Sequence, residues 1–179
     1  LVYGFSHDVN EDFVRKAIQK NTLMDHLQRV QVHEGDVFLI EPGTIHAIGG
    51  GVLLAEVQES SNITYRVYDY GRRDQSGNLR ELHVEKALAV MDFHAAKNIR
   101  RQQRIVKHIP GLASELVGRC RYFQVERLVT QHQCTLRQSN DTFYVLMVLN
   151  GQGKLGTENT ELRLHKGNTV FAPAREGVL

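Results

Sequence analysis

A short motif occurs twice in this chain, and it constrains the fold more than any other feature. The first copy reads HEGDVF at residues 33–38, and the second reads HKGNTVF at residues 165–171. Each copy continues through apolar residues to a proline, Pro42 in the first and Pro173 in the second. A glycine turn, a strand and a proline turn are typical of a strand that enters and leaves a small β-barrel. The repeat therefore predicts two barrel units of similar design.

The residues around the repeat predict a mainly β chain with a small helical segment. Residues 10–30 have helical apolar spacing, with Asn10 as N-cap and a break at Asn21-Thr22, so we expect two short helices there. A further short helix is expected at 84–93 and a turn at 76–78. Strand-like stretches follow the β-branched and apolar pattern. They are 30–40, 51–59, 64–70, 122–129, 142–149, 162–164 and 169–172.

These patterns predict three parts of the chain. Residues 1–30 form the helical segment, 31–95 belong to a first barrel, and 96–179 form a second barrel that is cut near its end. The border falls near residues 94–110, and the stretch 97–107 within this range holds five basic and no acidic residues. We interpret this stretch as a solvated connector; a patch for an anionic ligand is the alternative.

Composition excludes several classes of function. The longest apolar run, residues 143–149, is far shorter than the roughly 20 residues of a membrane helix, so no membrane partner is expected. A net charge of +2, and no aromatic residue within 97–107, argue against nucleic acid. Cys120 and Cys134 form no CxxC pair, which favours a reducing compartment and a cytoplasmic location. Oligomeric state stays open.

Gly35, Gly43 and His46 have the spacing of a known motif. They resemble the second motif of the cupin superfamily, in which the histidine is a metal ligand inside a jelly-roll barrel. The resemblance implies tandem cupin barrels and a metal at His46. In the second copy Val178 takes the place of this histidine, and Gln138, Asn140 and Tyr144 stand at the ligand positions of the first cupin motif. We therefore expect the second barrel to be free of metal.

A longer resemblance covers residues 41–48, 55–56 and 60–70. These blocks are similar to the type I mannose-6-phosphate isomerase family, in its short bacterial form. The resemblance implies interconversion of mannose 6-phosphate and fructose 6-phosphate, a sugar-phosphate substrate and one zinc ion. It places His46 as a zinc ligand, Arg66 as the active-site arginine and Glu56 in the pocket; Asn62 stands where relatives often have aspartate. The remaining zinc ligands are expected upstream of Leu1, which leaves the first barrel incomplete.

The predicted roles suit the chemistry. Proton transfer between C1 and C2 through an enediol needs a base and a stabilised oxyanion. Arg66 is a permanent cation, Glu56 is a candidate proton shuttle if burial raises its pKa, and neutral His46 is a suitable zinc ligand. Each residue also has a plain structural interpretation, an ion pair for Glu56 and Arg66 and a turn histidine for His46. A non-catalytic tandem cupin that binds sugar or regulates a partner is the alternative function.

Overall fold

The structure is a computed structural model that describes residues 1–99, 105–157, 160–174 and 177–178. The chain divides into two compact units. Unit 1 comprises Leu1–Ile105 and Leu116–Glu126, and unit 2 comprises Val106–Glu115 and Arg127–Leu179. The predicted borders at residues 30 and 95 remain predictions. The three arginines of the basic stretch at positions 100, 101 and 104 lie outside the described residues.

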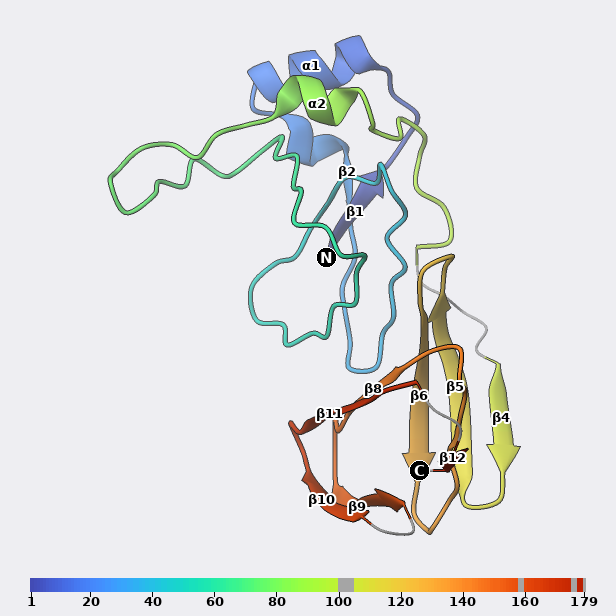
Figure 1. The fold of residues 1–179 in the computed structure, drawn as a ribbon. Coiled ribbons are helices and arrows are strands. Elements are labelled where there is room, and N and C mark those ends of the chain that lie inside the picture. The colour runs from blue at the N-terminus through green and yellow to red at the C-terminus, as the bar shows by residue number, and fades with distance from the viewer. Residues whose placement is uncertain (100–104, 158–159, 175–176, 179) are drawn as a thin grey trace. The chain divides into compact units, whose positions relative to one another are not determined.

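Unit 1 contains a small antiparallel sheet and three short helical pieces (Figure 1). The sheet has the strand order β2-β1-β3. Its strands are β1 (Val2–Phe5), β2 (Leu27–Arg29) and β3 (His46–Ala47). The helical pieces are α1 (Glu11–Gln19), the 3₁₀ turn η1 (Leu23–His26) and α2 (Val84–Leu88).

The two predicted N-terminal helices are confirmed, together with their start and their break. The Asn10 side chain accepts a hydrogen bond from the Phe13 amide at 2.9 Å, which satisfies one of the free N–H groups at the start of α1. Asn21 has a φ of 58°, a left-handed conformation that stops α1 before η1 begins. The local sequence therefore determines the start of α1 and the break after it, whereas residues 27–29, which were expected to be helical, form β2.

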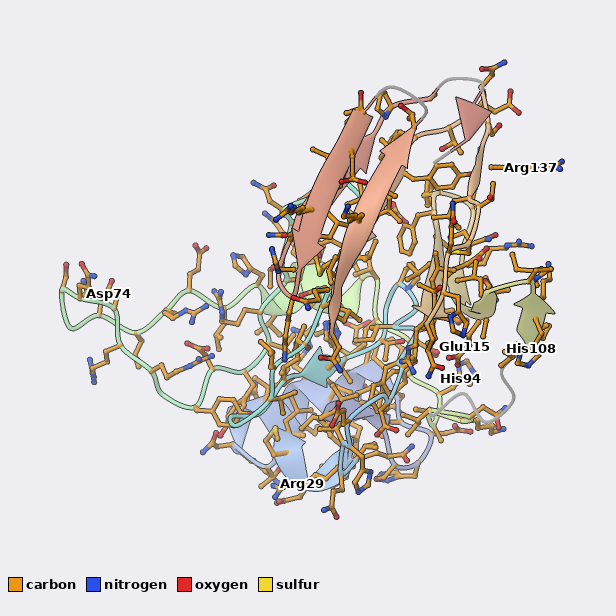
Figure 2. All side chains as sticks on the ribbon, turned by 90° about the horizontal axis from the view of Figure 1, so that it is seen from below. Arg29, Asp74, His94, His108, Glu115 and Arg137 are labelled. Atoms are coloured by element: carbon orange, nitrogen blue, oxygen red, sulfur yellow. The ribbon has the colours of Figure 1, made fainter. Side chains whose placement is uncertain are left out.

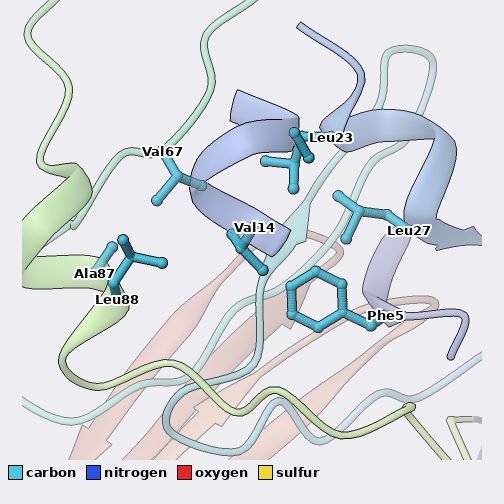
Figure 3. Close-up of a cluster of buried hydrophobic side chains, with 8 residues drawn as sticks. Phe5, Val14, Leu23, Leu27, Val67, Ala87 and Leu88 are labelled. Atoms are coloured by element: carbon cyan, nitrogen blue, oxygen red, sulfur yellow. The ribbon is translucent and has the colours of Figure 1, made fainter. Parts of the chain in front are cut away.

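The core of unit 1 lies where α1, η1 and α2 meet the sheet (Figure 3). Phe5, Val14 and Leu23 have less than 2% of their surface exposed. Val67 joins this cluster although it belongs to a segment without regular structure. Burial of Val67 anchors that segment to the core. The residue before it in the sequence is Arg66, one of the predicted site residues. The other members of the cluster are Ala17, Leu27, Ala87 and Leu88.

Three predicted strands of the first half are wrong as secondary structure. Residues 30–40, 51–59 and 64–70 contain no strand in the described chain, and Arg66 and Glu56 therefore do not lie on strands. A strand exists only as part of a hydrogen-bonded ladder. The sequence pattern reports a local preference, and within the described residues these segments have no paired neighbouring strand to complete the ladder.

The second half is built of strands, as predicted, which makes the chain mainly β. The predicted segments correspond to β6 (Gln124–Thr130), β8 (Tyr144–Met147), β10 (Thr160–His165) and β11 (Thr169–Ala172). These strands pair antiparallel: β9 and β10 are consecutive and form a hairpin, whereas β11 pairs with β8, which precedes that hairpin in the sequence. The further strands are β4 (Val106–Ile109), β5 (Leu112–Arg119), β7 (Arg137–Gln138), β9 (Gln152–Thr157) and β12 (Gly177–Val178).

The two copies of the repeat form the same turn. In the first, the Asp36 amide donates to the His33 carbonyl at 3.1 Å, and the Asp36 carboxylate accepts from the His33 amide at 2.9 Å. In the second, Asn168 makes both bonds with His165, at 3.0 and 2.8 Å. Gly35 and Gly167 have φ values of 84° and 89°, the left-handed conformation typical of the third residue of a type II turn. The repeat is thus a repeat of structure.

No helix within the described ranges is long and apolar enough to cross a bilayer.

Candidate functional site

A type II turn at residues 41–44 leads the chain into β3 and so to His46. The Thr44 amide donates to the Glu41 carbonyl at 3.1 Å. Pro42 sets the second position of this turn, and Gly43, with a φ of 87°, takes the third. A Cβ atom on Gly43 would lie 2.7 Å from the Val90 carbonyl oxygen, so the turn packs directly on the chain after α2. The Pro-Gly pair is therefore what places His46.

The ring of His46 has one nitrogen engaged and one available. Its Nδ1 atom lies 2.9 Å from the Thr44 carbonyl oxygen, and the side chain is exposed. A carbonyl only accepts hydrogen bonds, so Nδ1 carries the proton in the neutral ring and Nε2 keeps its lone pair. A backbone carbonyl on the second ring nitrogen is the arrangement that usually orients a metal-ligating histidine. His46 could thus hold a metal ion through Nε2.

Tyr3 lies opposite His46 in the β1–β3 pair and was not found by sequence reasoning. Directly paired residues of an antiparallel ladder point to the same face. The Tyr3 hydroxyl donates to the Leu39 carbonyl at 2.7 Å. Burial and, less strongly, the charge of Glu41 raise the pKa of Tyr3, against a smaller lowering by a hydrogen bond with Thr44. This tyrosine is therefore a neutral neighbour of the candidate ligand.

A cavity of about 420 Å³ opens beside Tyr3 in unit 1. Glu41, Thr44, Asp92 and His94 contribute to its wall. His46, Glu56 and Arg66 are not among its lining residues. The wall of this cavity next to β1 thus contains none of the predicted site residues.

Arg66 is anchored through both its backbone and its side chain. Its amide donates to the Nδ1 atom of His83 at 3.2 Å, and the His83 amide donates to the Arg66 carbonyl at 2.7 Å. Its Nη1 atom donates to the Glu81 carbonyl at 3.1 Å. Its Nε atom lies 3.8 Å from the carboxylate of Asp69, the one polar or charged residue among the buried ones of the described chain. Arg66 is therefore a fixed cation at the surface of the core.

Two more arginines approach the same carboxylate. Arg72 donates from Nε to Asp69 Oδ1 at 3.1 Å and also from Nη2, and the Nε atom of Arg80 lies 3.3 Å from Oδ2. We call Asp69 and its three arginines the Asp69 cluster. Sequence reasoning missed Asp69, Arg72 and Arg80, although Arg66, Asp69 and Arg72 stand at intervals of three residues. This spacing could have indicated that Arg66, Asp69 and Arg72 belong together, but it does not include Arg80.

Glu56 does not join the other predicted site residues. It lies in the irregular segment 52–59, and its side chain is exposed. Among the residues that the structure describes, no hydrogen bond or ion pair links Glu56 to His46 or Arg66, and no group of three or more His, Cys, Asp or Glu side chains has the geometry of a metal site. His46 therefore stands as one candidate ligand without the rest of a set.

Comparison with known proteins places these features in a family. Residues 114–179 match the mannose-6-phosphate isomerase cupin domain. Over 97% of its length the chain is 31% identical to "Mannose-6-phosphate isomerase ManA" of Bacillus subtilis and covers 54% of that protein. Over 97% of its length it is also 29% identical to "Mannose-6-phosphate isomerase" of Streptococcus mutans, of which it covers 53%. A crystal structure of the mannose 6-phosphate isomerase from Bacillus subtilis superposes on 99% of the chain with a TM-score of 0.85 and 27% identity, covering 55% of that structure.

The strand-rich fold, the repeated glycine turn and the matched domain define a cupin protein. Within that class, the chain is similar over nearly its whole length to mannose-6-phosphate isomerases. It spans about half the length of the curated relatives it matches.

Proposed function

We propose that this chain carries part of the active site of a zinc-dependent isomerase that interconverts mannose 6-phosphate and fructose 6-phosphate. The match to curated isomerases over nearly the whole chain supports this function. The observation that carries the assignment to this site is the hydrogen bond from His46 Nδ1 to the Thr44 carbonyl, which leaves Nε2 available to a metal. We place the protein in the cytoplasm, on its cysteine pattern.

His46 fits a zinc ion as one neutral imidazole ligand, and the described residues do not supply a complete ligand set around it. Zinc in such a site would orient the sugar oxygens and polarise the carbonyl. The other ligands of this proposal come from residues outside the described chain. We therefore expect weak zinc binding by the 179-residue chain alone.

Arg66 supplies positive charge to the oxyanion that develops as the carbonyl becomes an enediol. Its guanidinium is held at Nε and Nη1, so it loses little freedom when it meets the substrate. The three guanidinium groups of the Asp69 cluster outnumber its one carboxylate, which attracts an anionic sugar phosphate toward this surface. Glu56 is proposed as the proton shuttle, and its exposed position requires the surrounding irregular segment to close over the substrate.

Turnover is tested on a fusion in which the chain replaces the matching residues of the Bacillus subtilis isomerase. We expect this fusion to convert mannose 6-phosphate to fructose 6-phosphate, and the chain alone to be inactive. Arg66→Ala should lower kcat by roughly two orders of magnitude with unchanged zinc content, as loss of one oxyanion-stabilising group does. A fusion that is folded, binds the sugar phosphate and shows no turnover would instead favour the non-catalytic binding module.

Zinc binding is tested by equilibrium dialysis of the same fusion against zinc chloride. His46→Ala should abolish stoichiometric binding, and His165→Ala is the matched control, because His165 is an exposed turn histidine of the second repeat. Equal zinc content in both variants would remove His46 from the ligand set. Tight zinc binding by the chain alone through His46 would contradict the incomplete set proposed here.

A further inference from the structure

We propose that Asp69 is a positioning residue that sets the orientation of the Arg66 guanidinium; this inference rests on the proposed function of Arg66. Asp69 is 6% exposed, and its carboxylate lies within 4 Å of three different guanidinium groups. A buried carboxylate is costly unless it is paired with charge and hydrogen-bonded. The surrounding residues supply this compensation, and one of them is the proposed catalytic arginine.

The chain reaches this arrangement through a tight turn at residues 69–72. The Arg72 amide donates to the Asp69 carbonyl at 2.9 Å, and the two central residues, Tyr70 and Gly71, have φ values of 55° and 65°. Positive φ at both central positions defines a type I′ turn, which is costly for a tyrosine. The Arg72 guanidinium lies 5.8 Å from the centre of the Tyr70 ring. The turn therefore folds Arg72 back onto the Asp69 carboxylate.

A hairpin loop closes the other side of the carboxylate. After Arg72 the chain forms the projecting loop that carries Asp74 (Figure 2). The Asp74 carboxylate accepts hydrogen bonds from the amides of Ser76 and Asn78, and Arg80 follows this turn in the sequence. Arg80 approaches Asp69 Oδ2 at 3.3 Å, without the geometry of a hydrogen bond. Oδ2 thus has no hydrogen bond within the described residues. Asp69 ties together the base of a loop that projects from the unit.

These contacts leave one edge of Arg66 open. Nε faces Asp69 and Nη1 donates to the Glu81 carbonyl, while Nη2 has no hydrogen bond or ion pair in the part of the chain that the structure describes. The hydrogen bond at Nη1 and the ion pair of Nε with Asp69 at 3.8 Å orient the guanidinium, and the Nη2 edge is where a substrate oxygen can be bound. Arg72 and Arg80 also contact the carboxylate, which holds Asp69 in place beside Nε.

The first test uses the 179-residue chain and needs no enzymatic activity. The Arg66 Nε–Hε signal is assigned by nuclear magnetic resonance from its loss in Arg66→Lys. In the wild-type chain this proton should exchange with solvent several-fold more slowly than that of Arg73, whose Nη1 atom donates to the loop carbonyl of Gly77. Asp69→Asn should shift the Arg66 signal and remove its protection, and Asp69→Glu should restore part of it. Asp74→Asn is the matched control and should leave the signal unchanged.

The second test uses the active fusion and a double-mutant cycle. Asp69→Asn should lower kcat by roughly tenfold or more in the wild-type background, as misplacement of a catalytic group does. In the Arg66→Ala background the same substitution should not lower kcat any further, because a residue that acts through Arg66 has no effect once Arg66 is gone. Additive losses in the two variants would overturn the proposal.

The results separate this inference from the proposed function. A fusion without turnover overturns the proposed function, whereas the exchange and chemical shift of Arg66 still report on positioning. An Arg66 signal that is unprotected in the wild-type chain, or identical in folded Asp69→Asn, overturns the positioning role even if the fusion is active. Because the wild-type exchange rate is itself decisive, the proposal stays testable if Asp69→Asn does not fold.

Discussion

Replacement of Gly43 by alanine tests how the turn before His46 is built. Two costs follow from the structure. The φ of 87° costs a non-glycine residue about 1 kcal/mol. The new Cβ would lie 2.7 Å from the Val90 carbonyl oxygen, a distance so short that the two segments must move apart. The hydrogen bond from the Asp92 amide to the Gly43 carbonyl at 3.0 Å opposes this movement. Such overpacking costs about 1–3 kcal/mol. We expect a total loss of about 2–4 kcal/mol in the free energy of unfolding.

Gly77→Ala is the matched control for this prediction. Gly77 has a similar φ of 83° in the same unit, and a Cβ there meets nothing within 4 Å. Gly77→Ala should therefore lower the free energy of unfolding only by the cost of the backbone conformation, about 1 kcal/mol. Urea unfolding followed by circular dichroism measures both variants. If Gly43→Ala and Gly77→Ala lose the same stability within about 0.5 kcal/mol, the close packing of the turn on Val90 is refuted.

Two further predictions concern stability. Asn10→Ala removes the cap of α1 and should lower the free energy of unfolding by about 1 kcal/mol, whereas Asn10→Ser should restore most of it; equal stability of all three chains would contradict the capping role. The pKa of Tyr3 is higher in the folded than in the unfolded chain. Its contribution to the free energy of unfolding is therefore complete below about pH 10 and is lost as the pH rises through the folded-state pKa. Urea unfolding between pH 9 and 11 should therefore show a steeper loss for the wild-type chain than for Tyr3→Phe, and parallel curves would show that Tyr3 does not titrate differently on folding.

Local chemistry was predictable because it depends on few neighbouring residues. The Asn10 cap, the break at Asn21 and the turn at 76–78 are each decided within about four residues, and the structure has all three. The repeated turns at Gly35 and Gly167 follow for the same reason. The strands expected at 51–59 and 64–70 failed because pairing depends on a partner that the local pattern does not contain.

The candidate site divides in the same way. His46 and Arg66 were predicted from a motif, and the hydrogen bonds that orient them, from His46 to Thr44 and from Arg66 to Glu81, appeared only in the structure. Arg80 reaches Asp69 across a loop of ten intervening residues, a distance in sequence that no local pattern encodes. Glu56 was also a motif prediction, and the structure leaves it exposed and apart from both.

The sequence by itself determined the repeat, the capped helix, the Pro-Gly turn before His46 and the resemblance to an isomerase family. Each is carried by residue types whose backbone preferences or side-chain chemistry act over a few positions. Only the tertiary structure decided that Asp69 is buried among three arginines and that Arg66 keeps one open edge. The physical reason is that burial and charge pairing are properties of segments brought together in space, here by Val67 in the core and by the loop that returns Arg80 to Asp69.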